Sequence, residues 1–373
     1  MHTSVDVQLR KLAVEAQLAD DIPFGSYSFI SEQIFDVLTA MLHCVSKSSD
    51  HAGNLARVLG NLDQSARRVV SKDAALRRTV EDGVCSFHLH LETVDLGLFN
   101  EILRAAADAA TTGGETLLGA NACCLPLSAT GNYGSVWLAN TSGSPAADRF
   151  EGEVSKRLPG FKIYEPTDAC IDSLLEGVIV AEKIAPSLTR SALAHNSIVL
   201  MGGFEGEGQR FDSATVPGLP GVILLNPSVC SSVVDAAQAL VHESMHLKFL
   251  DIDYIRPLFA PGFRPGQSPL ITPIWHLEKP GFGDWPVDRV LTSMHVYIAM
   301  SVFLRSACNY FGRDASESEK FELEAELSLE RATWLFSCLQ SYLTELSLSG
   351  RRFVHWTGKI LDYLNDTTGQ TRG

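Results

Sequence analysis

The pattern of apolar residues changes near residue 115, and this change constrains the fold more than any other feature of the sequence. Before it, apolar side chains recur at helical spacing over 29–44, 55–70 and 98–110. After it come short apolar or β-branched runs separated by Gly, Asn, Ser and Pro, as is typical of strands; they are 117–125, 133–138, 160–164, 197–201 and 221–225. Helical patterns return at 171–184, 232–250, 286–308, 317–346 and 353–364. The sequence therefore predicts an α+β protein that is predominantly helical, in which the helix over 232–250 and a downstream helix pack with a small β-sheet.

The length of 373 residues is sufficient for two or three domains. We expect a helical N-terminal region over 1–114, an α+β catalytic region over 115–310 and C-terminal helices over 311–373. The segment 251–285 is rich in Pro and Gly. We expect it to be a long irregular loop, and loops of this length commonly carry function.

The charge of the chain excludes some classes of partner. Lys and Arg number 30 against 44 Asp and Glu, which gives a net charge of −14. A nucleic acid or an anionic membrane would need a basic face, so neither is an expected partner. The N-terminal residues do not resemble a signal peptide, and no apolar run approaches the ~20 residues that a membrane span requires. The eight cysteines are scattered and contain no CxxC pair. These features predict a cytoplasmic protein with reduced thiols.

The strongest chemical signal is the sequence HESMH at 242–246, an HExxH motif in the middle of the predicted helix 232–250. Residues four apart lie on one face of a helix, so the imidazoles of His242 and His246 can ligate one metal ion. Glu243 is one step around the helix, where it can reach a metal-bound water or orient a ligand. Polar side chains are costly to bury without partners. We therefore predict a metal site rather than two histidines in a helix core.

A metal site of this type needs a third protein ligand. The extension of the motif that many zinc proteases carry, with a further Gly and His shortly after it, is missing here. His295, on the helix predicted to begin near 286, is the leading candidate. Asp288 shares its face of that helix and could be a ligand or could orient one. His276 is a weaker alternative.

Several of these features together resemble a known family. They are the strand that ends in Asn226-Pro227, the helix with the HESMH motif, the Pro-rich segment with Trp275, and the helix with Arg289 and His295. This part of the chain, about 195–305, is similar to the HEXXH-motif peptide-modification proteins. Those proteins occur beside genes for ribosomally made, post-translationally modified peptides. They are regarded as iron(II)- and 2-oxoglutarate-dependent peptide β-hydroxylases.

The resemblance implies a function and a set of site residues. His242, His246 and His295 would hold iron(II) and leave positions for 2-oxoglutarate and O₂. The distal carboxylate of 2-oxoglutarate needs a cation, which an arginine supplies in bidentate fashion. Arg289 is the first choice, and the rival arginines are Arg256, Arg264 and Arg305. The substrate would be a precursor peptide that is hydroxylated at a β-carbon.

Two other classes of function remain open at this point. In a zinc metallopeptidase, Glu243 would act as the general base on a metal-bound water. In a peptide-binding or scaffold protein, the metal would be structural or absent. The third ligand separates the enzymes, because His295 with a nearby arginine favours iron and an oxo-acid, whereas a helical glutamate favours zinc hydrolysis.

Two further patterns are weaker. The sequence HLHLE at 88–92 has histidines two apart, but its surroundings are helical or mixed, so we interpret it as structural. The Gly-rich run 202–208 contains glutamates, and no Lys followed by Ser or Thr completes a phosphate-binding loop. We expect this run to be a turn or lid near the site.

Overall fold

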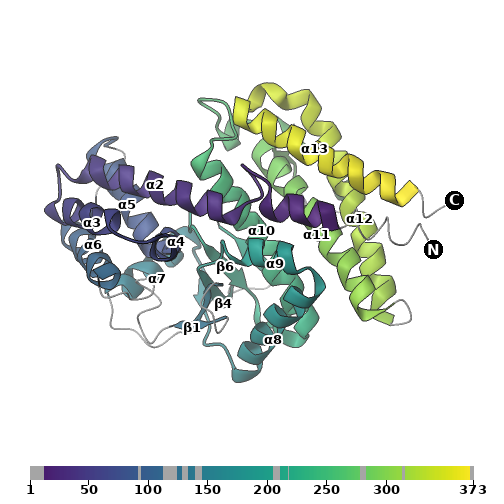
Figure 1. Ribbon diagram of the computed structural model, residues 1–373, viewed down its shortest axis with the longest axis horizontal. Helices are drawn as coiled ribbons and strands as arrows, with labels where there is room; N and C mark the ends of the chain where they lie inside the picture. Colours follow the sequence, from purple (N-terminus) through teal and green to yellow (C-terminus); the bar gives the residue numbers. More distant parts are fainter. Residues whose placement is uncertain are drawn as a thin grey trace. The chain divides into compact units, whose positions relative to one another are not determined.

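The computed structural model has a predominantly helical α+β fold, which confirms the predicted fold class (Figure 1). It describes residues 12–90, 94–111, 124–127, 133–138, 145–204, 211–216, 218–277, 283–312 and 316–369. The chain divides into two compact units. Unit 1 comprises Met1–Ser26, Ala181–Ser191 and Lys248–Gly373, and unit 2 comprises Tyr27–Val180 and Ala192–Leu247. The boundaries expected near 114 and 310 do not coincide with this division.

The helices account for most of both units. Within the described residues, unit 2 contains α2 (Tyr27–Val45), α3 (Asp50–Gly60), α4 (Gln64–Lys72), α5 (Ala74–Phe87), α6 (Leu96–Thr111) and α7 (Pro145–Arg157). Unit 1 contains α11 (Val287–Phe311), α12 (Ser316–Leu339) and α13 (Leu348–Gly369). Three helices run from one unit into the other: α8 (Asp168–Ile184), α9 (Pro186–Leu193) and α10 (Val233–Ile255).

A mixed sheet lies at the centre of unit 2. Its strands are β1 (Cys124–Pro126), β2 (Ser135–Trp137), β3 (Phe161–Ile163), β4 (Ile198–Phe204), β5 (Ser213–Thr215) and β6 (Val222–Leu225). β4 pairs in parallel with β2 and β6, β1 and β5 extend the sheet antiparallel to β2 and β6, and β3 pairs antiparallel with the end of β4. The predicted strands at 197–201 and 221–225 are thus confirmed. Most of the predicted strand 117–125 lies outside the described residues.

The residues of β4 and β6 alternate between two apolar cores, because successive side chains of a strand point to opposite faces. Leu200 packs in one core with Phe150 of α7. Val199 packs in the other with Leu174 of α8 and Leu240 of α10. Both strands are therefore almost continuously apolar, as is typical of strands buried on two faces. This packing anchors the helix that carries the HExxH motif to the sheet.

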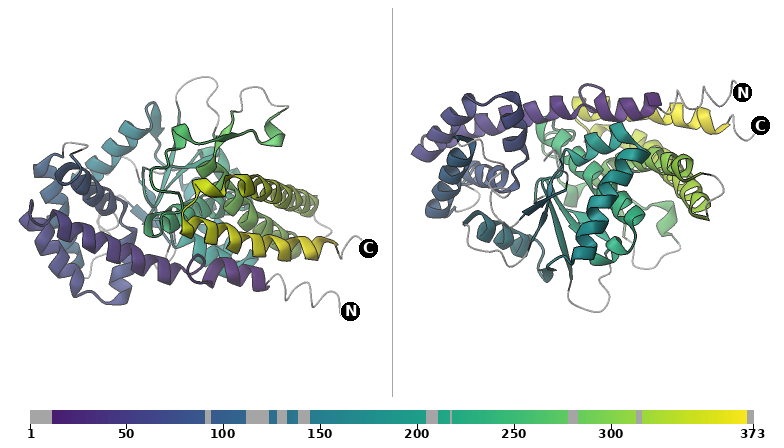
Figure 2. Two further views of the ribbon diagram at one scale, coloured as in Figure 1. Left: turned by 90° about the horizontal axis from the view of Figure 1, so that it is seen from above. Right: turned by 60° about the horizontal axis from the view of Figure 1, so that its bottom comes forward.

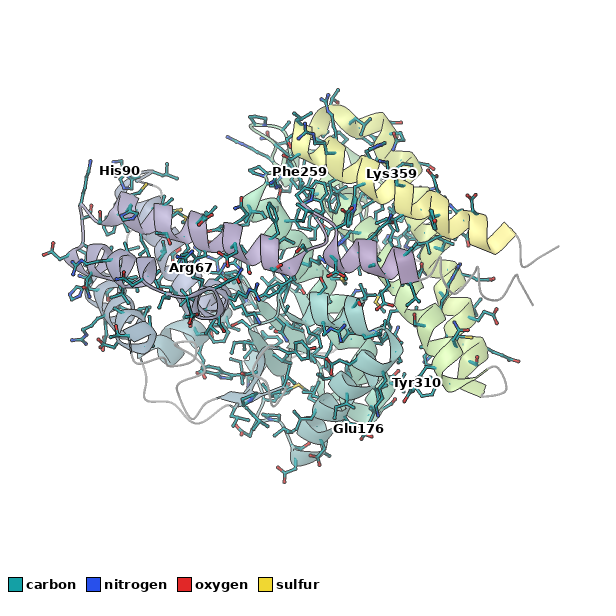
Figure 3. The ribbon with its side chains drawn as sticks, viewed as in Figure 1. Arg67, His90, Glu176, Phe259, Tyr310 and Lys359 are labelled. Atoms are coloured by element: carbon teal, nitrogen blue, oxygen red, sulfur yellow. The ribbon has the colours of Figure 1, made fainter. Side chains whose placement is uncertain are left out.

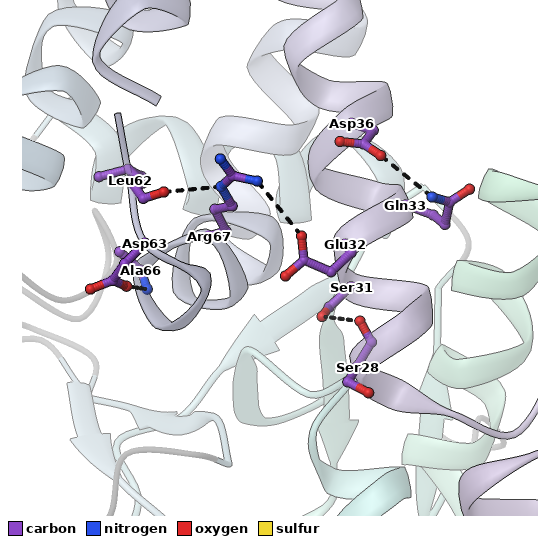
Figure 4. Close-up of polar contacts among 9 residues, drawn as sticks. All are labelled: Ser28, Ser31, Glu32, Gln33, Asp36, Leu62, Asp63, Ala66 and Arg67. Atoms are coloured by element: carbon purple, nitrogen blue, oxygen red, sulfur yellow. Dashed lines mark hydrogen bonds and ion pairs between the residues drawn. The ribbon is translucent and has the colours of Figure 1, made fainter. Parts of the chain in front are cut away.

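The segment 55–70, predicted as one helix, is instead two helices with a break at residues 61–63. The side chain of Asp63 begins α4 by accepting a hydrogen bond from the Ala66 amide at 2.9 Å (Figure 4). The Arg67 side chain also donates to the Leu62 carbonyl at 3.0 Å. An aspartate that bonds the backbone locally favours a helix start over a helix interior. The apolar spacing continues across the break, so periodicity alone could not locate it.

Unit 1 is built around α11 and α12, which lie side by side (Figure 2). Among the described residues, α11 is the single helix whose length and hydropathy would suit a membrane span, and 78% of its most apolar window is buried inside the protein. It has the burial of a core helix. Phe259, labelled in Figure 3, lies in the segment after α10 and forms a β-bridge with Leu346. Its ring stacks on that of Phe263, with the two centroids 4.6 Å apart.

A fully buried lysine joins three segments of unit 1. The Lys248 ammonium donates to the carbonyls of Leu18 and Gly25, each at 2.6 Å, and to the Ser191 hydroxyl at 2.7 Å. Three oxygen acceptors match the three donors of an ammonium group. Burial lowers the pKa of Lys248 to about 7, and Asp20 opposes this shift.

Candidate metal site on helix α10

Helix α10 begins where the sequence predicted and ends later. The Ser232 hydroxyl caps the helix: it accepts hydrogen bonds from the amides of Val234 at 3.2 Å and Asp235 at 3.3 Å, which agrees with the start predicted at 232. The helix continues to Ile255, five residues past the predicted end. The first residues of the segment 251–285 are therefore helical and not irregular as expected. Residues 233–256 contain no Gly or Pro, so the first helix-breaking residue is Pro257.

The two motif histidines lie next to each other on α10. The centroids of the His242 and His246 rings are 5.1 Å apart, with an angle of 60° between the ring planes. Both residues are partly exposed, and the His242 side chain retains 35% of its accessible surface. Two imidazoles in this arrangement could hold an ion that arrives from solvent. Ligation itself stays a prediction.

Glu243 is fixed between α10 and the edge strand β5. Its carboxylate accepts a hydrogen bond from the Ser213 hydroxyl on Oε1 and another from the Thr215 hydroxyl on Oε2, each at 2.7 Å. The side chain is buried, with a residue exposure of 3%. His242 is also close, with its Nε2 3.8 Å from Oε1 of Glu243. We call Ser213 and Thr215 the β5 hydroxyl pair.

The β5 hydroxyl pair was missed by the sequence analysis. Ser213 and Thr215 are two apart on a strand, so their side chains point to the same side of the sheet. The sequence Ser-Ala-Thr has this alternation of hydroxyl side chains. Their partner, Glu243, lies about thirty residues later in the chain. No local signal connects the two segments.

The predicted third ligand, His295, belongs to unit 1 and is completely buried in α11. Its ring lies among aromatic side chains of the same unit: the centroid separations are 6.2 Å to Phe249, 5.4 Å to Phe353 and 6.3 Å to Trp356. Within unit 1, His295 is therefore a member of an aromatic core. Its role as a ligand remains a prediction from the sequence.

Asp288, the alternative on the same helix, lies in the first turn of α11. Burial raises the pKa of its carboxyl, while the backbone amides of Asp288 and Arg289 and the Arg289 guanidinium act against this shift. Burial also raises the pKa of Asp253, with a further rise from the nearby charge of Asp288. Two carboxylates thus lie near each other in a poorly solvated part of unit 1.

Arg289, the predicted anchor for an oxo-acid, is exposed. Its guanidinium carbon lies 4.6 Å from the centroid of the Trp285 ring. A guanidinium stacked on an aromatic face keeps its N–H edge available for a carboxylate. Of the rivals, Arg264 is exposed, whereas burial lowers the pKa of Arg305 against the effect of Glu326 and Glu322.

The other histidines singled out by the sequence have local structural contacts. His276 is buried, with Nδ1 3.3 Å from the Gly283 carbonyl oxygen and its ring 5.1 Å from that of Trp285. His88 ends α5, and its Nε2 lies 2.8 Å from the carbonyl oxygen of Cys44. Residues 91–93 of the HLHLE pattern lie outside the described part of the chain.

The Gly-rich run begins inside a strand rather than in a turn. Gly202 and Gly203 belong to β4, where β3 pairs with them. A Cβ on Gly202 would lie 2.3 Å from the Lys162 carbonyl oxygen. Close approach of β3 therefore requires this glycine. The prediction of a lid concerns mainly 205–208, which lie outside the described residues.

Within the described residues, no group of three or more His, Cys, Asp or Glu side chains is arranged to hold a metal ion. His242 and His246 are a pair, with Glu243 bound to hydroxyls beside them. Comparison with known proteins adds no further assignment. No protein-family model matches the chain, and a search of curated proteins finds no match.

Proposed function

We propose that this protein is an iron(II)- and 2-oxoglutarate-dependent oxygenase that hydroxylates a β-carbon in a ribosomally made precursor peptide. The observation that best supports an oxygenase over a peptidase is the state of Glu243. Both of its carboxylate oxygens accept hydrogen bonds from the β5 hydroxyl pair. A carboxylate held in this way suits a role in stabilising the ligands of the metal more than the role of a general base.

The donor set of the site fits iron(II) in part. Imidazole is a good ligand for both iron(II) and zinc, and two imidazoles at a spacing of four residues occupy neighbouring positions on one ion. His242 and His246 meet this condition, and their partial exposure provides access. Iron(II) bound there would supply the O₂-dependent oxidation of a C–H bond, with 2-oxoglutarate as the electron donor.

The residues of the chain then have distinct roles. His242 and His246 bind the ion, and His295 is the predicted third ligand. Glu243 lies beside His242, with its Oε1 3.8 Å from Nε2, where its negative charge would stabilise a cation bound by that ring. Arg289 would bind the distal carboxylate of the oxo-acid with the N–H edge that Trp285 leaves uncovered.

The alternative is a zinc metallopeptidase, which the same histidine pair would serve. In that case Glu243 must take a proton from a metal-bound water. Because each carboxylate oxygen can accept more than one hydrogen bond, the water would have to reach Glu243 beside the hydroxyl that already donates to it. The alternative thus needs a metal-bound water to reach a carboxylate that is 3% exposed, whereas the oxygenase does not.

The test uses the full chain, reconstituted without oxygen with iron(II) and then given 2-oxoglutarate, O₂ and a candidate precursor peptide. We expect succinate and a one-oxygen mass gain on the peptide. His242→Ala and His246→Ala should lose bound iron and keep the far-UV spectrum, whereas His51→Ala, which removes an exposed histidine of α3, should change neither. Stoichiometric zinc with peptide cleavage that Glu243→Gln abolishes, and no succinate, would establish the peptidase instead.

A further inference from the structure

Helix α12 carries exposed apolar side chains, among charged ones, on the side opposite the one that packs in unit 1. Leu323 is 59% exposed and Leu327 38% exposed, and the partly exposed Arg331 and Trp334 follow at spacings of four and three residues. Such spacings place all four side chains on one side of the helix. We call these four residues the α12 ridge. The opposite side is occupied by core residues, including Phe321, Ala325, Ala332 and Leu335.

The ridge continues onto the segment before α11. The ring of Trp275 lies 5.4 Å from that of Trp334, and the Arg331 guanidinium carbon lies 5.3 Å from the Trp275 centroid. On either side of Trp275, Ile274 is 44% exposed and Leu277 is 70% exposed. All of these residues belong to unit 1. The ridge and the segment 274–277 therefore form one apolar surface.

The composition of this surface is that of a protein interface. Isolated exposed leucines are common, but a contiguous apolar patch usually marks a contact site. Trp and Arg are the residues most often found to dominate binding energy at such sites. Here Trp334 and Trp275 are held by neighbouring rings and by Arg331, so little side-chain entropy would be lost on binding.

The charges beside the ridge identify the kind of partner. Four exposed glutamates of α12 lie on its solvent side: Glu319, Glu322, Glu326 and Glu330. The cations beside these glutamates are Arg331, Lys320, which pairs with Glu324 at 4.0 Å, and Arg305 of α11, whose charge interacts with Glu322 and Glu326. The glutamates of this side outnumber these cations. A second copy of the chain would bring glutamates against glutamates, at a net charge of −14 per chain. A basic partner meets no such repulsion.

We propose that the α12 ridge, with residues 274–277, is a docking site for a basic amphipathic helix of a partner protein. The partner helix would present apolar residues every three or four positions to the ridge and Lys or Arg to the flanking glutamates. This inference does not depend on the metal site.

The probe is a synthetic peptide of about 18 residues, the length of about five helical turns. Its leucines are spaced three or four apart, and lysines flank them. Two control peptides have the same leucines with glutamate flanks, or the same composition in scrambled order. Each carries a fluorophore, and its anisotropy is measured against the full chain. We expect the basic peptide to bind with a dissociation constant on the order of 10 μM and neither control to bind.

Variants of the chain define where the peptide binds. Leu323→Ser with Leu327→Ser should weaken the basic peptide roughly tenfold or more. Glu319→Lys with Glu330→Lys should weaken it and strengthen the acidic peptide. Leu348→Ser, at a leucine of α13 that is 67% exposed, is the matched control and should change nothing. All of these positions are exposed, so the thermal midpoint should be unchanged and serves as the check on folding.

Three results would overturn the proposal. One is no binding of the basic peptide at about 1 mM, beyond the range of a weak specific contact. Another is equal binding of the scrambled peptide. The third is sedimentation of the wild-type chain as a dimer that Leu327→Glu dissociates, which would make a second copy the occupant.

Discussion

Removing one of the two hydroxyls that bind Glu243 should destabilise the protein in a way that depends on the charge of Glu243. Thr215→Val keeps the branched shape of the side chain and deletes the donor that lies 2.7 Å from Oε2. A hydrogen bond to a charged group contributes about 1.5–3 kcal/mol, and more is lost where the remaining partner is buried. Glu243 is 3% exposed, so water does not readily replace the hydroxyl. We expect a loss of about 2–3 kcal/mol in the free energy of unfolding.

The role of the charge is measured with a second substitution. In a Glu243→Gln background the partner is a neutral amide, and the same Thr215→Val change should cost about 0.5–1.5 kcal/mol. The difference between the two costs is the coupling energy of a double-mutant cycle. Urea unfolding is followed by far-UV circular dichroism and tryptophan fluorescence together, because two units could unfold separately.

The matched control is Thr333→Val on α12. Its hydroxyl donates to the backbone carbonyl of Leu329 at 2.8 Å, so no charged group loses a partner. This change should cost under about 1 kcal/mol. Our reading of the β5 hydroxyl pair would be refuted if Thr215→Val cost no more than this control, or if its cost were the same with Glu243 and Gln at position 243.

Three other predictions concern the scaffold around the site. Lys248→Met removes the ammonium donor from three buried oxygen atoms of unit 1, of which the Gly25 carbonyl keeps the Ser191 hydroxyl as a donor at 3.2 Å; the change should cost about 3 kcal/mol or more, measured by urea unfolding, and a smaller loss than that of Thr215→Val would contradict it. Asp288 has a raised pKa in the folded protein, so the folded state binds its proton more tightly and stability is lost as pH rises from about 3.9 through the folded pKa. Asp288→Asn should therefore be more stable than wild type at pH near 7 and not in acid, and an equal difference at both would exclude this linkage. Gly202→Ala should lower the thermal midpoint because its Cβ would lie 2.3 Å from a backbone oxygen, whereas at Gly203 the nearest atom is a tyrosine hydroxyl at 3.2 Å, so similar effects of the two changes would be unexpected.

The sequence predicted the elements that depend on local signals. The strands at 197–201 and 221–225 are continuous apolar runs, and α10 begins at the position that the sequence indicated, with Ser232 as its cap. The pairing of His242 with His246 followed from the helical repeat alone. Each of these predictions needed only residues within a few positions of one another.

Other features depend on contacts between distant segments, which a single sequence does not encode locally. The partners of Glu243 come from β5, about thirty residues earlier, and those of Lys248 come from segments more than fifty residues away. The break before α4 depends on one aspartate within an uninterrupted apolar repeat. The sequence analysis placed Gly202 in a turn. A side chain is excluded there by the close approach of β3, which the residues next to Gly202 in the sequence do not reveal.

The HExxH motif does not by itself determine the chemical role of its glutamate, because that role depends on how α10 packs. Adjacent residues of a helix point about 100° apart, so Glu243 does not share the face of His242 and His246. Its chemistry is therefore decided by the element that packs beside the histidine face. In this chain that element is β5, whose two hydroxyls donate one hydrogen bond to each carboxylate oxygen and bury the side chain beside the strand. A helix with the same motif and an open groove in place of β5 would leave the carboxylate free to act on water. The strand, more than the motif, is thus the basis on which we propose oxidation over hydrolysis at this site.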